Sequence, residues 1–157
     1  MQTFSLSANI ENTTFDVTNY IATPNTQSVI GNIINGYNIG IHSFNLIGSY
    51  GTGKSSFLLA IEHDLGKPNK KIFSDFDSKV LSSSREFEIL KLTGDYEDLA
   101  ISLSRKLEIE GNSNSVIDAL RNKYNELKSK DKFLVIIIDE FGKVLEHAAK
   151  NNPEREL

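Results

Sequence analysis

Cysteine is absent from the sequence. Its absence excludes a disulfide framework, a thiolate zinc site and a cysteine nucleophile, and it leaves no sign of an oxidising compartment. Positive charge is also in short supply, because 17 Lys and Arg residues face 21 Asp and Glu residues, for a formal net charge of -4. Proteins that hold nucleic acid through its phosphates usually have a basic excess. The chain therefore gives no indication of nucleic-acid binding, although a local basic face is compatible with these totals.

Long apolar runs are absent too. The longest, FLVIII at residues 133 to 138, is far shorter than the roughly 20 residues of a membrane-spanning helix. The amino-terminal stretch MQTFSLSANIENTT has neither the positive charge nor the apolar segment of a signal peptide. At 157 residues the chain is long enough for one domain with a core. We therefore expect a soluble, cytoplasmic protein with no membrane partner.

The first forty residues predict an amino-terminal region ahead of the core. Residues 1–22 mix apolar side chains with Asn and Thr, which suits short strands or an extended arm. A short helix should follow, with Thr23 as N-cap, Pro24 at the first helical position and Gly36 as the stop. We predict that residues 1–40 lead into a core that spans residues 41–157.

Strand and helix patterns alternate in that core. Strand patterns occur in IHSFNLI (41–47), EFEILKL (86–92) and KFLVIIIDE (132–140). The last is apolar on both faces, as expected of a buried strand in a parallel sheet. Helix patterns occupy residues 54–65, 95–111, 114–130 and 141 to about 150. The alternation predicts an α/β fold in which helices cover a parallel sheet.

The loop between the first strand and helix of this core carries the clearest motif. Residues 48–55 read GSYGTGKS and match the phosphate-binding pattern G-x-x-x-x-G-K-[ST] at every fixed position. Glycines let the backbone fold tightly so that successive amides turn inward on an anion, and the following helix adds its positive dipole end. Lys54 would reach the β- and γ-phosphates, and the Ser55 hydroxyl would ligate Mg²⁺.

We therefore expect the loop and the start of its helix to bind a nucleoside triphosphate. The expected binding residues are Gly48, Ser49, Tyr50, Gly51, Thr52, Gly53, Lys54, Ser55 and Ser56. The alternative is a glycine-rich turn that merely caps a helix. Two glycines, a lysine and a hydroxyl at fixed offsets, between a strand pattern and a helix pattern, make that alternative the weaker one.

A second constellation stands at the end of the apolar strand 132–140. A parallel strand would deliver Asp139 and Glu140 to the carboxyl edge of the sheet, where the glycine loop is also expected. Asp139 is then expected to hold Mg²⁺ through its waters, and Glu140 to activate the attacking water. The alternative is an ordinary strand end whose two acids cap the next helix.

Together, residues 48–55 and the stretch IIIDE at 136–140 resemble P-loop ATPases of the group with an additional strand and a catalytic glutamate. This group includes AAA-type ATPases, signalling ATPases of the STAND kind and DNA-handling motors. The resemblance covers about residues 41–150 and implies a P-loop fold with ATP and Mg²⁺ as ligands. It also implies that Ile21, Pro24 and Tyr37 form one wall of the adenine pocket, although the same residues would also suit a core.

The sequence departs from that group after Asp139. The family places a further strand between the P-loop strand and the Asp139 strand, followed by a sensor residue and an arginine finger, and no room for them remains before Leu157. The core would then be incomplete at the carboxyl end, with unpaired strand edges. We therefore expect the amino-terminal piece of a larger bacterial ATPase, or a missing segment supplied by a protein partner or a second copy.

Three functions are compatible with these motifs. The leading one is Mg²⁺-dependent ATP hydrolysis that drives a conformational change or an assembly, with Lys54 and Glu140 as catalytic residues. The second is an ATP-gated interaction or signalling module with little turnover of its own. A small-molecule kinase is third, because the Asp-Glu pair suits activation of water. ATP is favoured over GTP because the guanine-specific Asn-Lys-x-Asp motif is missing.

Other polar residues receive structural interpretations. The three histidines, His42, His63 and His147, are not spaced as a ligand set. Thr93 and Asp95 are expected to cap a helix that begins near Tyr96. Residues 67–84 are polar, and a loop anchored by Phe73 or a short strand is expected there, with Asp75 and Asp77 in a solvated turn.

Overall fold

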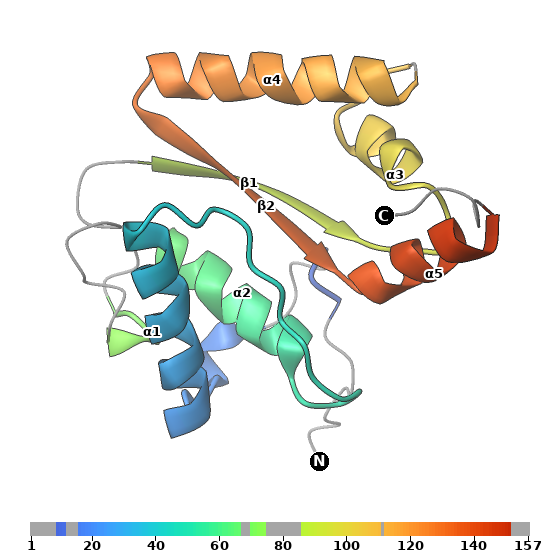
Figure 1. Ribbon diagram of the computed structural model, residues 1–157. Coiled ribbons are helices and arrows are strands. Elements are labelled where there is room, and N and C mark those ends of the chain that lie inside the picture. Colours follow the sequence, from blue (N-terminus) through green and yellow to red (C-terminus); the bar gives the residue numbers. More distant parts are fainter. Residues whose placement is uncertain (1–8, 12–15, 67–69, 75–85, 111, 152–157) are drawn as a thin grey trace. The chain divides into compact units, whose positions relative to one another are not determined.

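The computed structural model describes residues 9–11, 16–66, 70–74, 86–110 and 112–151. The chain divides into two compact units, residues 1–86 and 87–157, each described by itself below. Mixed α/β architecture, with five α-helices and a two-stranded parallel sheet, is confirmed for the described residues (Figure 1). No described helix has the length and apolar character needed to span a membrane.

The described residues near the start of the first unit form turns rather than strands. Among its described residues before the first α-helix, 9–11 form a turn and Val17–Asn19 form a 3₁₀ helix, η1, so no described residue of 1–22 lies in the expected strands. Ile10 is fully buried there. A lone strand in this region would leave its backbone groups without a ladder partner, whereas a 3₁₀ turn satisfies them locally.

Helix α1, Pro24–Asn38, starts as expected and ends later than expected. The Thr23 hydroxyl accepts a hydrogen bond from Thr26 N, and Pro24 occupies the first turn. Gly36 lies inside the helix, so its prediction as the stop is wrong. Its role is packing, because a Cβ at Gly36 would lie 2.9 Å from Cε1 of the Phe44 ring.

Helix α2, Lys54–Leu65, has the predicted bounds. It packs on a core with loop residue Phe73, whose ring meets the rings of Tyr20 and Phe57 edge-on at 5.9 and 5.5 Å. Buried residues of α2 are Phe57, Leu59, Ala60, Asp64 and Leu65. The apolar pattern alone would have placed Leu58 and Ile61 on this face, but both are only half-buried.

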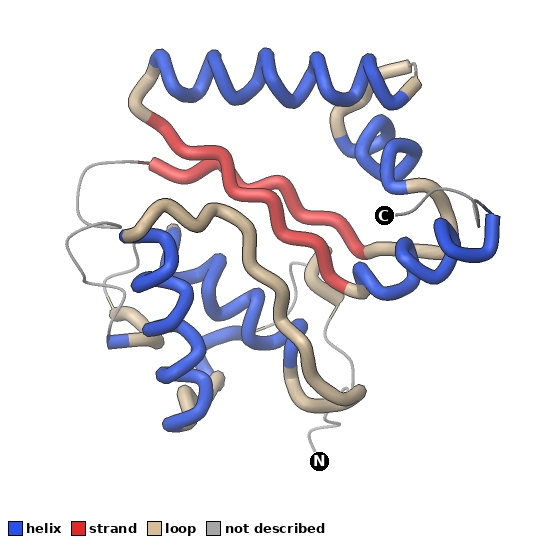
Figure 2. Tube along the Cα trace, in the orientation of Figure 1, coloured by secondary structure: helices blue, strands red, loops and turns tan. Residues whose placement is uncertain are grey.

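The prediction of a strand at 41–47 is wrong. Residues 39–53 instead form loop and turn between α1 and α2 (Figure 2). Strand geometry requires a partner for the backbone N–H and C=O groups. In the described part of the chain, strand pairing joins only the two strands of the second unit. Ile41 and Ile47 are 46% and 97% exposed, so the alternating pattern does not mark a buried face here.

The second unit contains a parallel strand pair with a two-helix crossover. Strand β1 (Glu86–Thr93) is followed by α3 (Leu99–Lys106), α4 (Ser113–Ser129), strand β2 (Lys132–Asp139) and α5 (Phe141–Asn151). Figure 1 shows α3 and α4 on the same side of the strand pair. A tight hairpin reverses the chain direction and therefore joins antiparallel strands. Parallel strands need a longer crossover of this kind, which returns the chain to the end of the sheet where the first strand began.

Alternation along the strands divides the sheet into two faces. Leu90, Leu92, Leu134 and Ile138 pack with residues of α3 and α4, including Leu103 and Val116, in one core cluster. On the other face, the rings of Phe87 and Phe133 stack with centroids 5.5 Å apart. The apolar character of β2 on both faces thus serves two different sets of contacts.

Helix α3 begins three residues later than the sequence pattern predicted. Asp98 is the N-cap and its carboxylate accepts a hydrogen bond from Ala100 N. The Asp95 side chain instead accepts from Tyr96 N in the preceding turn, so the cap expected at Thr93 or Asp95 is wrong. The segment between Thr93 and Asp98 is therefore free of helix and forms a loop at the carboxyl end of β1.

Candidate functional site

The glycine loop lies in the first unit, and two of its glycines have positive φ. Gly51 and Gly53 have φ values of 77° and 81°, in the left-handed region that glycine adopts without a Cβ penalty. Gly48 lies in tight space, because a Cβ there would lie 3.1 Å from Thr52 Oγ1. Positive φ therefore favours glycine at positions 51 and 53, and close packing favours it at position 48.

Lys54 closes this loop on itself. Its Nζ donates to the carbonyl oxygens of Gly48 and Ser49 at 2.9 and 2.8 Å. The Thr52 hydroxyl donates to the same Ser49 carbonyl at 2.8 Å. Because an ammonium carries three donors, one N–H of Lys54 remains beyond these two bonds. The loop is a closed ring with a cation at its centre.

Helix α2 starts at Lys54 without a side-chain cap. Its N-cap residue is Gly53, which has no side chain and so makes no capping hydrogen bond. The first amides of the helix therefore keep their donors for another acceptor, and the helix dipole places partial positive charge at the same point. Ser55 and Ser56 lie half-buried in this first turn, whereas Tyr50 is 88% exposed. The arrangement can bind an anion.

The predicted acids lie in the second unit, at the carboxyl end of β2. Asp139 is 6% exposed, and its Oδ1 accepts a hydrogen bond from Glu140 N at 2.9 Å. The exposed Glu140 directly precedes α5 and has a left-handed backbone with φ of 54°. Its carboxylate is 4.0 Å from Lys143 Nζ. One acid is therefore inside the unit and the next is open to solvent.

A residue outside both sequence motifs holds this turn in place. Gly94, the first residue after β1, donates its N–H to the Asp139 carbonyl at 2.7 Å. A Cβ at Gly94 would lie 2.8 Å from the Glu140 carbonyl oxygen and 3.0 Å from Val144 Cγ2. A glycine directly after a predicted strand was the only available signal, and it does not say which segment approaches.

Residues with other expected roles can also be placed. Tyr37, expected near the adenine, packs edge-on against His42 with centroids 5.2 Å apart, and Ile21 is 80% exposed. His63 Nδ1 contacts the buried Asp64 carboxylate at 3.0 Å. Among the described residues, no three His, Asp or Glu side chains gather as a metal-ligand group. Asp75 and Asp77 lie outside the described residues.

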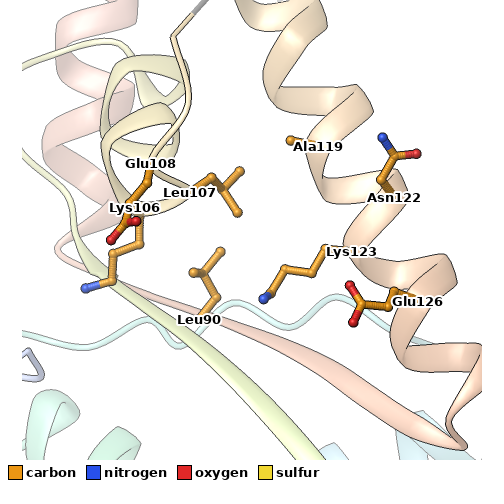
Figure 3. Close-up of a pocket in the computed structure, with 8 residues that line it drawn as sticks. All are labelled: Leu90, Lys106, Leu107, Glu108, Ala119, Asn122, Lys123 and Glu126. Atoms are coloured by element: carbon orange, nitrogen blue, oxygen red, sulfur yellow. The ribbon is translucent and has the colours of Figure 1, made fainter.

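The second unit also has an open pocket of about 380 Å³, away from the predicted acids (Figure 3). It lies between α4, the end of α3 and β1. Leu90 and Leu107 supply apolar surface, and Lys123 and Glu126 come from α4. These two charges already have partners, Glu88 for Lys123 and Lys130 for Glu126. The pocket gives no specific indication of a ligand.

No protein-family model, curated protein or solved structure matched the chain. Functional inference therefore depends on the chain's own residues, chiefly the closed glycine loop of the first unit and the acidic turn of the second.

Proposed function

We propose that this protein is an Mg²⁺-dependent ATPase with a P-loop fold. The glycine loop, residues 48–53, and the start of α2 bind the phosphates of ATP. Asp139 and Ser55 hold the magnesium ion, and Glu140 acts on the water that attacks the terminal phosphate. Hydrolysis is then coupled to a conformational change or to assembly with a partner.

The observation that carries the proposal is the closed ring around Lys54. Two left-handed glycines, the hydrogen bonds from Lys54 Nζ to Gly48 and Ser49, and an uncapped helix start occur within seven residues. A turn that served only to begin a helix would not need a lysine bent back over its own carbonyls. A phosphate uses all three features, because it accepts from backbone amides and is attracted by the lysine charge.

The available donors fit magnesium better than a transition metal. Ser55 offers a hydroxyl and Asp139 a carboxylate, and Mg²⁺ prefers oxygen ligands and keeps several waters and substrate phosphate oxygens. A dedicated cage of three or more protein ligands is not required for such an ion. The lack of such a cluster among the described residues is compatible with this role. Bound magnesium would neutralise phosphate charge as the bond to the terminal phosphate breaks.

Glu140 is assigned to water because of its position and its backbone. It stands outside the core, next to a buried aspartate, and its left-handed φ is an uncommon conformation for a non-glycine residue. Strained backbones of this kind are concentrated at functional sites. An exposed carboxylate at the end of a strand can accept a proton from a water that it orients.

The experiment measures nucleotide affinity and phosphate release separately. Fluorescent ATP binding and steady-state phosphate release are measured for the unchanged chain, Lys54→Ala and Glu140→Gln. Lys54→Ala should weaken binding about 10- to 100-fold, because one charge-assisted contact is lost. Glu140→Gln should bind ATP normally and lose at least about 100-fold in turnover, the usual contribution of a general base.

Exposed residues of the same types provide the controls. Lys70→Ala removes an exposed lysine outside the glycine loop, and Glu146→Gln removes an exposed carboxylate on α5; both should leave binding and turnover unchanged. Full binding in Lys54→Ala would contradict the phosphate role. ATP binding without turnover in the unchanged chain would favour an ATP-gated module over an ATPase.

A further inference from the structure

We propose that Gly94 is a positioning residue that fixes the backbone of Glu140 and, through it, the direction of the Glu140 carboxylate. The inference rests on the proposed function, because it takes Glu140 to be the group that acts on water. All of the contacts that support it lie within the second unit.

The backbones of the two strand ends meet at this glycine. Gly94 N donates to the carbonyl of Asp139 at 2.7 Å, so the exit of β1 is tied to the last residue of β2. The next carbonyl, that of Glu140, accepts from Lys143 N at 3.0 Å, and Glu140 N donates to Asp139 Oδ1 at 2.9 Å. The peptide groups on both sides of Glu140 are thus engaged, which restricts rotation at its Cα.

Glu140 differs from the other non-glycine residues with positive φ. Among the described residues these are Glu108, Asp131 and Glu140, with φ values of 55°, 54° and 54°. Glu108 and Asp131 each follow the end of a helix, where a left-handed residue commonly terminates the hydrogen-bond ladder. Glu140 instead lies between a strand and the start of a helix. Its conformation therefore needs another cause, and the contact with Gly94 provides one.

Space, rather than conformation, requires the glycine at position 94. Gly94 is not among the glycines with positive φ, so no left-handed backbone demands a glycine there. A Cβ, however, would lie 2.8 Å from the Glu140 carbonyl oxygen and 3.2 Å from its carbonyl carbon. Because both are backbone atoms, the clash is relieved by moving the peptide that follows Glu140 or the Gly94 backbone, which is hydrogen-bonded to the Asp139 carbonyl that precedes Glu140. Such a movement turns the Glu140 Cα and redirects its carboxylate.

The test uses Gly94→Ala with Gly142→Ala as its matched control. Gly142 lies two residues after Glu140 in α5, and a Cβ there meets nothing within 4 Å. Gly94→Ala should move the amide resonances of Glu140, lower the turnover number about 100-fold, as expected for a misplacement near 1 Å, and leave ATP affinity unchanged. Gly142→Ala should keep normal turnover and ATP affinity.

A double-mutant cycle separates positioning from general damage. In a Glu140→Gln background, Gly94→Ala should cause no further loss of turnover, because its effect passes through the carboxylate that is already absent. An equal loss in both backgrounds, or an unmoved Glu140 resonance, would overturn the inference while leaving the proposed function intact. Absence of hydrolysis in the unchanged chain would instead overturn the proposed function, and the inference with it.

If Gly94→Ala does not fold, the cycle is run in a Val144→Ala background. That change removes the side-chain contact at 3.0 Å and leaves the clash with the Glu140 carbonyl. Turnover by Gly94→Ala/Val144→Ala should then fall about 100-fold below that of Val144→Ala alone. Equal turnover in these two variants would overturn the inference.

Discussion

The two units each contain a buried aspartate, and their surroundings are different. Asp64, in the first unit, is 1% exposed, and its two carboxylate oxygens accept hydrogen bonds from Ile72 N and Phe73 N at 2.8 to 3.1 Å. His63 Nδ1 is a further neighbour at 3.0 Å. Asp139, in the second unit, is 6% exposed, and Glu140 N donates to its Oδ1 from the adjacent residue.

The difference separates a structural carboxylate from one that is suited to a ligand. Both oxygens of Asp64 are occupied by a distant loop, which ties the end of α2 to residues 70–74. Among the described residues, the Asp139 carboxylate accepts a hydrogen bond only from the backbone N–H of Glu140. Its oxygens therefore retain acceptor capacity. Burial alone therefore does not distinguish the two acids, whereas the partners of their carboxylate oxygens do.

The largest effect is expected from Asp64→Asn. An amide has one acceptor oxygen where the carboxylate has two, so it would direct an NH₂ group at one of the backbone N–H donors. We expect the free energy of unfolding to fall by about 3 kcal/mol, the typical result of disrupting a buried charged group with satisfied hydrogen bonds. Urea unfolding followed by circular dichroism measures this. A loss below about 1 kcal/mol would contradict the structural role.

Asp139→Asn is expected to give the reverse pattern. An amide oxygen can still accept from Glu140 N, so the free energy of unfolding should change by less than about 1 kcal/mol. Loss of the charge should instead weaken magnesium binding about 10- to 100-fold, as for residues that hold a metal through its waters. The measurement compares ATP affinity with Mg²⁺ and with EDTA. A large loss of stability without any change in Mg²⁺ dependence would make Asp139 a second structural carboxylate.

The two aspartates also mark what could be predicted from the sequence. The glycine loop was identified because all of its determinants lie within residues 48–55, and the predicted bounds of α2 are confirmed. The structural role of Asp64 could not be predicted, because its carboxylate binds the backbone amides of Ile72 and Phe73. Every residue except proline has such an amide, so the residue types give no indication of the contact. Gly94 was missed for the same reason, since its contact is with backbone atoms remote in sequence.

Local patterns failed where the tertiary partner decides the outcome. IHSFNLI has the alternation of a strand, but in the structure residues 41–47 are loop, because a strand exists only beside another strand. Asp95 and Asp98 are both good N-caps, and the chain begins α3 after the second. By contrast, β1, β2, α4 and α5 were predicted within a few residues, because each has a long and consistent apolar pattern.

The smallest effect is expected from an exposed carboxylate on α5. Glu146 Oε1 accepts from Lys150 Nζ at 2.6 Å, and this hydrogen bond, with the lysine charge, lowers the pKa of Glu146 from its ordinary value of 4.5. Because the pKa of Glu146 is lower in the folded state, its ionisation stabilises the fold at pH values above the unfolded-state pKa. This contribution is lost as the pH falls through the folded-state pKa. Because both side chains are about half exposed or more, solvent screens this contribution.

Lys150→Met should therefore return the pKa of Glu146 towards its ordinary value while leaving unfolding at neutral pH almost unchanged. Carboxyl carbon resonances followed through a pH titration measure this directly. Lys130→Met is the matched control, because Lys130 lowers the pKa of Glu126 on α4 in the same way and should shift that group alone. Asp64, Asp139 and Glu146 all accept hydrogen bonds from N–H donors. If Lys150→Met nevertheless destabilised the fold as much as Asp64→Asn, burial and the occupancy of both carboxylate oxygens would not set how much an acid contributes to the free energy of unfolding. The presence of a hydrogen bond alone would then set that contribution.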